Sequence, residues 1–186
     1  MCRGLYLMRT LKNNICNEVL ITVYYGHVHS HLNYGILLWG GHPAANKLFV
    51  LQKRAIRLIC GVNPLEHCKP LFTELGILTQ PSMYVLACLL YVKLNINNFT
   101  TRSQLHNYPT RNNYKLNINK CQYTTTQKNF KYTWVKLYNE LPEQIRNLSY
   151  STFRRVVIAA LRANPLYKIN EFYNLRLFWI FNLWRN

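Results

Sequence analysis

The sequence predicts a mainly α-helical protein, a small helical bundle with a long basic loop or arm. Several segments place apolar residues three and four positions apart, which is the spacing of one face of an α-helix. No segment alternates apolar and polar residues for long enough to require a β-sheet. The chain has 186 residues, of which 49% are hydrophobic, so it can bury a core in one domain or in two small ones.

The first long helical pattern covers residues 17–38. The residues that share its stripe are Leu20, Val23, Tyr24, His27, Val28, His31 and Tyr34. The sequence WGGHP at 39–43 ends the pattern, because Gly and Pro favour turns. We interpret Gly40-Gly41 as a turn, since a phosphate-binding loop would lead into a Lys-Ser/Thr pair.

The clearest amphipathic helix lies in AANKLFVLQKRAIRLICG, residues 44–61. The apolar face is expected to contain Leu48, Leu51, Ala55, Leu58 and Ile59. The basic residues expected away from that face are Lys47, Lys53, Arg54 and Arg57. Gly61 is a natural end for this helix.

Further elements follow in order along the chain. A short helix is expected at 70–76, and a third long helix begins near Thr79 and Pro81, apolar on most faces and therefore expected in the middle of the bundle. Residues 98–133 lack periodicity and predict a long loop or arm. Helical spacing then returns, and Ser151 is the expected N-cap of the last helix.

The charge balance bounds the possible functions. The chain has 23 Lys and Arg against 6 acidic residues, a formal net charge of +17, which favours a polyanionic partner. All six acids are glutamates, and only Glu140 and Glu143 lie close together in the sequence. Two-metal phosphoryl chemistry and Asp-oriented triads both need carboxylates held close together. We therefore expect no polymerase or nuclease chemistry from this chain alone.

Two groups of residues are candidates for metal or catalytic sites. His27 and His31 share a helical face, but His29 does not, and no glutamate lies between them, so we interpret these histidines as structural or surface residues. Cys60, His67 and Cys68 lie close in sequence, but no second ligand pair stands at zinc spacing. We predict no cofactor in this chain, reduced thiols, no membrane span, and a cytoplasmic or nuclear location.

The strongest chemical pattern is a basic and aromatic one. No acid lies between Glu74 and Glu140, whereas lysines and arginines alternate there with tyrosine, phenylalanine and tryptophan. Cations can bind phosphates and flat rings can stack on bases, so this pattern favours nucleic acid over a solvated polar arm. The candidate nucleic-acid-binding residues are Lys47, Lys53, Arg54, Arg57, Arg102, Arg111, Lys115, Lys120, Lys128 and Lys131.

Several blocks in order resemble one protein family. They are HSHLNYGILLWGG, LFVLQKRAIRLICGV, CKPLFTELGILTQPSMYVLACLLYV, HNYPTRNN and WVKLYNELPEQIRNL followed by FRRVVIAALRANPLYKINEFY. This order is similar to the region after the polymerase core in non-LTR, LINE-type (jockey-like) retrotransposon reverse transcriptases. The resemblance covers about residues 15–173, and the tail 174–186 departs from the family pattern.

The resemblance implies a division of the chain and a role. It implies a thumb-like helical bundle at 1–97, a basic aromatic arm or linker at 98–136, C-terminal helices at 137–173 and an atypical tail at 174–186. The family's RNA-directed DNA polymerase centre uses aspartates that hold Mg²⁺, and this chain has no aspartate. The chain would thus be a fragment without the catalytic core, with RNA or DNA template-primer and other parts of the element's polymerase as partners.

Two alternatives belong to other classes. The chain could be a helical protein–protein interaction module, a domesticated fragment whose apolar helices at 81–97 and 152–161 serve a partner. A metal-dependent enzyme would require tightly bound zinc in the purified protein.

Overall fold

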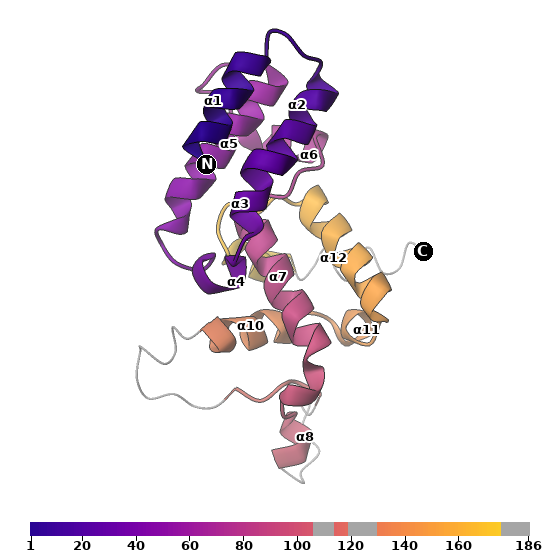
Figure 1. The fold of residues 1–186 in the computed structure, drawn as a ribbon. Coiled ribbons are helices and arrows are strands. Elements are labelled where there is room, and N and C mark those ends of the chain that lie inside the picture. The colour runs from indigo at the N-terminus through magenta and orange to yellow at the C-terminus, as the bar shows by residue number, and fades with distance from the viewer. Residues whose placement is uncertain (106–113, 119–129, 176–186) are drawn as a thin grey trace. The chain divides into compact units, whose positions relative to one another are not determined.

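The protein is mainly α-helical, as the sequence predicts (Figure 1). A computed structural model describes residues 1–105, 114–118 and 130–175. Within these ranges the only β-type pairing is an isolated antiparallel bridge between Thr101 and Leu116. No helix in the described ranges has both the length and the apolar character that crossing a membrane requires.

The chain forms two compact units. Unit 1 combines residues 1–84 with residues 161–167, and unit 2 combines residues 85–160 with residues 168–186. The helices that begin in unit 1 are α1 (Cys2–Leu11), α2 (Asn17–Tyr24), the π-helix η1 (Tyr25–His29), α3 (Ser30–Asn33), α4 (Ile36–Trp39), α5 (Ala45–Cys60), α6 (Cys68–Glu74) and α7 (Gln80–Leu94). Those that begin in unit 2 are η2 (Ile96–Asn98), α8 (Arg102–Leu105), α10 (Phe130–Asn139), α11 (Glu143–Arg146), α12 (Tyr150–Ala163) and α13 (Glu171–Asn174).

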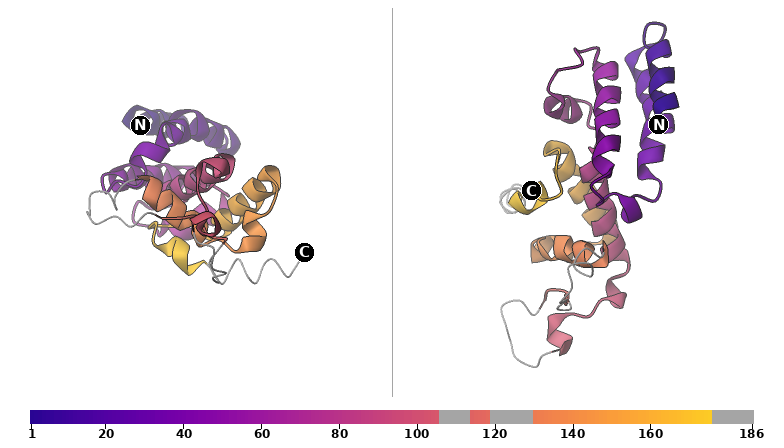
Figure 2. Two further views of the ribbon diagram at one scale, coloured as in Figure 1. Left: turned by 90° about the horizontal axis from the view of Figure 1, so that it is seen from below. Right: turned by 90° about the vertical axis from the view of Figure 1, so that its left-hand side faces the viewer.

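Three helices make the centre of unit 1. Helices α1, α2 and α5 run beside one another and contact one another, as the two views of Figure 2 agree. Their contact surfaces bury Met8, Leu20, Tyr24 and Ile56 almost completely. Burial of such large apolar side chains is the main force that holds helices together in water.

The predicted single helix over residues 17–38 is wrong in its continuity. A π-helical turn, η1, follows α2, and the helix is interrupted at Gly35, which has a φ of 59°. Such a left-handed conformation favours glycine, so α4 starts afresh after it. Because of these breaks the buried stripe contains Leu20, Tyr24, Val28 and Leu32.

Four residues of the predicted stripe are not buried. His27, His31 and Tyr34 are exposed, and Val23 is half-buried.

Helix α5 is confirmed, and Gly61 ends it in the left-handed conformation with a φ of 69°. Its buried face is rotated from the predicted one. The face comprises Ala45, Phe49, Gln52, Ala55, Ile56 and Ile59, whereas Leu48, Leu51 and Leu58 are only half-buried. The rotation places a glutamine in the core, which an apolar-pattern argument does not anticipate.

Gln52 is fully buried because all of its polar groups have partners. Its Nε2 donates to the Tyr24 hydroxyl and to the Leu78 carbonyl, both at 2.9 Å. Its Oε1 accepts from the backbone N–H of Gln80 at 2.7 Å. The first turn of α7 is thereby fixed to α2 and α5 inside unit 1, since a buried polar group without partners would destabilise the fold.

Unit 2 is built on the second half of α7, where Val85, Cys88, Leu89 and Val92 are buried and Leu94 is exposed. The rings of Tyr91 and Trp134 lie 4.6 Å apart between α7 and α10. On α12, Phe153 and Val157 are fully buried. The core of unit 2 is thus aromatic as well as aliphatic.

The predicted N-cap of α12 is wrong by two residues. The helix begins at Tyr150, and the side chain that accepts from its first turn is Ser149, whose Oγ lies 3.4 Å from the backbone N of Thr152. Ser151 lies inside the helix. Three hydroxyl residues follow one another closely here, so the spacing alone could not single out the cap.

Candidate nucleic-acid interface

The site in unit 1 is centred on Tyr167, which reaches the unit through the returning segment 161–167. Two side chains at the start of α7 hold this segment. Thr79 Oγ1 donates to the carbonyl of Leu166 at 2.6 Å, and Ser82 Oγ accepts from the Leu166 backbone N–H at 3.1 Å. Thr79 also caps α7, since its Oγ1 accepts from the Ser82 backbone N–H at 3.3 Å. These buried hydrogen bonds fix the backbone next to Tyr167.

Two rings from separate elements pack on Tyr167. Phe49 of α5 meets it edge to face, with ring centroids 5.1 Å apart and an interplanar angle of 87°. His67, just before α6, stacks on it at 6.2 Å and 15°. Both arrangements are among those that aromatic pairs prefer. The phenol ring is therefore held from two directions.

Two lysines lie over the same rings. Lys53 Nζ is 4.9 Å from the centroid of Phe49 and 5.5 Å from that of Tyr167. Lys69 Nζ is 5.9 Å from the centroid of Tyr167. Cations at these distances are attracted by the electrons of the ring face. We call Phe49, Lys53, His67, Lys69 and Tyr167 the Tyr167 cluster.

Arg57, one turn after Lys53 on α5, borders the Tyr167 cluster. Its Nε donates to the backbone carbonyl of Glu66 at 2.8 Å, which holds the loop that carries His67. Neither Lys53 nor Arg57 forms an ion pair with a carboxylate among the described residues. Their charges therefore remain available to an anionic ligand.

The two described cysteines near the Tyr167 cluster are unsuited to nucleophilic catalysis. Burial raises the pKa of the Cys68 thiol, and the positive charges of Arg57 and Lys53 offset this only in part. Burial also raises the pKa of Cys60, with a further contribution from Glu74. Because the thiolate is the reactive form, both residues are poor nucleophiles at neutral pH.

The histidines among the described residues do not form a cluster. His27 and His31 are exposed, whereas His29 is half-buried with its ring centroid 5.1 Å from that of Tyr25. Within the described ranges, no three side chains of the His, Cys, Asp and Glu types lie close enough together to hold a metal ion.

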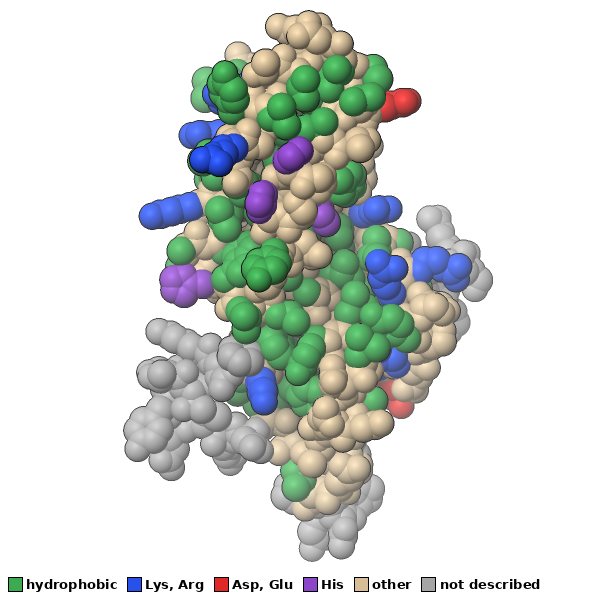
Figure 3. Space-filling view, in the orientation of Figure 1, with side chains coloured by type: hydrophobic (Ala, Val, Ile, Leu, Met, Phe, Trp, Pro, Cys, Tyr) green, Lys and Arg blue, Asp and Glu red, His purple; other side chains and the backbone are tan. Residues whose placement is uncertain are grey.

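The structure brings together only part of the predicted set of nucleic-acid-binding residues. Lys53 and Arg57 meet at the Tyr167 cluster, while Lys47 and Arg54 are exposed along α5. At 100° per residue these four side chains span an arc of about 120° on the helix. Lys and Arg side chains are spread over the face in Figure 3, and acidic ones are sparse there.

The other predicted residues lie elsewhere. Arg102 is on α8, Lys115 is in the described segment 114–118, and Lys131 is on α10; these three belong to unit 2. Arg111, Lys120 and Lys128 fall outside the described residues.

Sequence reasoning assigned no binding role to four members of the Tyr167 cluster, namely Phe49, His67, Lys69 and Tyr167. His67 was considered only as a metal ligand. Lys69 gave a weak signal as an isolated cation between two helical segments. Tyr167 gave none, because it is far from α5 in sequence and joins it only through the fold.

Comparisons with models of known protein families, with curated proteins and with solved structures found no match to this chain.

Proposed function

We propose that this chain is a fragment of a non-LTR retrotransposon reverse transcriptase, without the catalytic core, that retains nucleic-acid binding. The Tyr167 cluster carries the binding part of the proposal, because it places two lysines against an aromatic platform in a chain with a net charge of +17. The ordered sequence blocks of the retrotransposon family support the ancestry.

In this proposal, RNA or a DNA template-primer binds chiefly through its backbone. Lys53 and Lys69 are the phosphate contacts at the Tyr167 cluster, and Arg57, Arg54 and Lys47 extend them along α5. Such contacts release condensed counterions from the nucleic acid, so the affinity falls as salt is added. Binding of this kind positions a strand without reading its sequence.

The remaining parts of the proposal follow from the family. Mg²⁺ would belong to a polymerase core that this chain does not contain, and the chain would hold no cofactor itself. Other parts of the element's polymerase would be further partners. The proposed location is cytoplasmic or nuclear.

The binding proposal is tested by fluorescence anisotropy with a labelled single-stranded RNA over a series of salt concentrations. We expect the logarithm of the affinity to fall linearly with the logarithm of the salt concentration. Lys53→Gln is expected to weaken binding and to reduce the slope by about one. Arg9→Gln is the matched control, because it removes one exposed charge from α1 in the same unit without touching the Tyr167 cluster.

Equal losses in Lys53→Gln and Arg9→Gln would mean that only net charge matters and would remove the Tyr167 cluster from the proposal. Binding that is insensitive to salt would exclude the backbone mode altogether. The ancestry is tested separately by sequencing the transcript upstream of the codon for Met1. An open frame that continues into a polymerase core with paired aspartates would support it, whereas an unrelated upstream sequence would oppose it.

One observation favours the second candidate, a helical protein–protein interaction module. Tyr34 and Leu38 lie four residues apart, on either side of the break at Gly35, and are 86% and 75% exposed. By contrast, the apolar side chains of the segments 81–97 and 152–161, the expected partner surfaces, are buried or half-buried except for Leu94, Ile96 and Ala159. Stable hetero-assembly that Leu38→Glu abolishes, together with indifference to RNA, would favour this candidate.

A further inference from the structure

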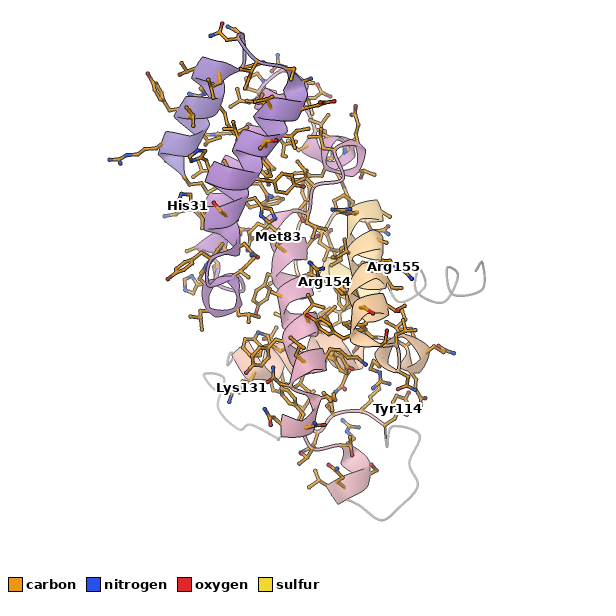
Figure 4. All side chains as sticks on the ribbon, turned by 45° about the vertical axis from the view of Figure 1, so that its right-hand side comes forward. His31, Met83, Tyr114, Lys131, Arg154 and Arg155 are labelled. Carbon is orange, nitrogen blue, oxygen red and sulfur yellow. The ribbon has the colours of Figure 1, made fainter. Side chains whose placement is uncertain are left out.

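Arg146, at the end of α11 in unit 2, is a buried arginine that is only partly satisfied. It is 7% exposed. Its Nη1 donates to the backbone carbonyl of Tyr114 at 3.1 Å, and its guanidinium carbon lies 4.6 Å from the centroid of the Tyr114 ring. Tyr114 lies beside α11 in Figure 4. One donor and one face of the guanidinium are thus used within unit 2.

The remaining donors are buried without an acceptor. Nε and Nη2 of Arg146 are out of contact with solvent and have no hydrogen-bond partner among the described residues. An arginine side chain stays protonated in proteins, so a positive charge is held here. Removing such donors from water without a partner costs roughly several kcal/mol. A buried arginine in this state is therefore unusual.

The two unsatisfied donors have a defined geometry. Nε and Nη2 lie on the same edge of the planar guanidinium, and their N–H bonds point the same way. This edge matches two oxygens of a carboxylate or a phosphate. The bond to Tyr114 uses the other side of the group, so it leaves this edge intact.

A second cation, Lys93, contacts the backbone of Arg146. Lys93 Nζ donates to the backbone carbonyl of Arg146, and its charge lies 5.6 Å from the ring centroid of Phe153. No carboxylate of the described residues pairs with Lys93 or Arg146. Glu143, one turn before Arg146 on α11, is exposed. Two positive charges without a counter-ion favour a ligand that carries more charge than one carboxylate.

We propose that the Nε–Nη2 edge of Arg146, with Lys93, is a binding site for a phosphate group. The phosphate would accept two parallel hydrogen bonds from Arg146, and Lys93 would add to the attraction. The surroundings are dry, so this attraction is stronger than at a solvated surface. Access requires a side-chain movement, and the Tyr114 ring over the guanidinium face is 45% exposed.

This site is independent of the proposed nucleic-acid interface, since it shares no residue with the Tyr167 cluster and lies in the other unit. The phosphate could be inorganic phosphate or the terminal phosphate of an oligonucleotide. The shared chemistry is a phosphate with at least two free oxygens, and the experiment distinguishes the two sources.

The first test uses the unmodified full-length chain. The arginine Nε–H resonances are followed by ¹H–¹⁵N NMR while inorganic phosphate is added, with chloride at equal ionic strength as the control. We expect a saturable shift of a single slowly exchanging Nε–H signal, assigned to Arg146 by its absence in Arg146→Lys. No saturable shift beyond that seen with chloride, for phosphate and for both oligonucleotides below, would overturn the proposal.

The second test measures affinity in variants. Arg146→Lys keeps the charge but loses the two-donor edge, and we expect about tenfold weaker phosphate binding. Arg155→Gln removes an exposed charge on α12 (Figure 4) and is expected to leave phosphate binding unchanged. Equal weakening in both variants would contradict a specific site. If Arg146→Lys does not fold, Lys93→Gln replaces it with the same expected direction.

Oligonucleotides with a 5′-phosphate and with a 5′-hydroxyl separate the sources. Stronger binding of the phosphorylated strand that depends on Arg146 would assign the site to a nucleic-acid end, and a response to inorganic phosphate alone would assign it to the free ion. RNA binding lost in Lys53→Gln but kept in Arg146→Lys would show that the two sites fail independently.

Discussion

At the scale of single residues, Gly40 shows how closely unit 1 is packed. A Cβ at this position would lie 2.5 Å from Cδ2 of Tyr84 and 2.6 Å from the carbonyl oxygen of Ile36. Neither neighbour can move freely, because Tyr84 is buried and the carbonyl is backbone. Gly40 therefore has two roles: it forms the turn that the sequence predicts, and it leaves room for the ring of Tyr84.

We expect Gly40→Ala to lower the free energy of unfolding by about 1–3 kcal/mol, the usual effect of overpacking. Gly26→Ala is the matched control, because a Cβ at Gly26 would meet nothing within 4 Å. It should be neutral or stabilise by up to about 1 kcal/mol, since alanine favours helical backbone. Urea denaturation of both variants measures the difference, and equal stabilities would contradict the close contact.

His29 makes the stability of unit 1 depend on pH. Burial lowers its pKa below the ordinary value of 6.5, so the folded chain favours the neutral ring. The unfolded chain takes up a proton near pH 6.5, and it therefore binds more protons than the folded chain between the two pKa values. The free energy of unfolding is expected to fall as the pH drops through this window. Above the window, the contribution of His29 to stability is complete.

The variant His29→Asn should flatten this part of the pH dependence, whatever its effect on stability at pH 7.5. His31→Asn changes an exposed histidine two positions away and should leave the slope as it is. Urea midpoints between pH 5.5 and 7.5 supply the measurement. A wild-type slope that persists in His29→Asn would place the titrating group elsewhere.

At the scale of elements, the described segment 114–118 is fastened to α10 by one side chain. Asn139 Oδ1 accepts from the backbone N–H of Leu116 and its Nδ2 donates to the Leu116 carbonyl, both at 2.9 Å. Leu116 is 2% exposed, so water cannot replace these bonds in the folded state. The amide of Asn139 thus substitutes for a neighbouring strand.

Replacing Asn139 by alanine removes both bonds and leaves a buried donor and acceptor on Leu116. We expect a loss of about 1–3 kcal/mol and faster hydrogen exchange at the Leu116 amide. Asn147→Ala is the control, since Asn147 is exposed just after α11. Unchanged exchange at Leu116 in the Asn139 variant would contradict the role of this amide.

The elements that depend on local sequence could be predicted. Helices α5 and α7 follow from their spacing and from Gly61, and the mainly helical class follows from the absence of alternation. The π-helical turn η1 within 17–38 could not be predicted in this way, because it packs against a residue distant in sequence: a Cβ at Gly4 would lie 2.9 Å from the His27 carbonyl oxygen, inside η1. Local periodicity contains no information on such an approach.

The residues of the candidate sites likewise fall into those that local sequence predicts and those that it does not. Lys53 and Arg57 could be predicted from the charged side of α5, because a helix face is a local property. Tyr167 and Arg146 could not, since the first is brought to α5 by hydrogen bonds to Thr79 and Ser82, and the second is recognised only by the acceptors that it lacks. Burial without a partner is a property of the fold and not of a sequence pattern.

At the scale of the whole molecule, neither unit is a continuous stretch of chain. Unit 1 needs residues 161–167 in addition to residues 1–84. Thr79 and Ser82 are fully buried, and both bind the backbone of Leu166. Without this segment the two hydroxyl groups would lose their partner on the returning chain.

Two truncations test this dependence. A chain that ends at Ala160 should lose hydrogen-exchange protection in α5 as well as in α7, because unit 1 is incomplete. A chain that ends at Tyr167 removes only residues assigned to unit 2 and should keep the protection of α5. Equal protection of α5 in both truncated chains would show that residues 161–167 are not needed for unit 1.

The discontinuity of unit 1 also matters while the protein is being made. Helices α1 to α6 leave the ribosome long before residues 161–167 are translated, yet Tyr167 packs against Phe49 of α5. Phe49 in turn lies 6.2 Å from Phe72 of α6, ring centre to ring centre. Until residue 167 is translated, the nascent chain therefore lacks the ring that packs on Phe49, and it presents aromatic surface of the kind that chaperones bind.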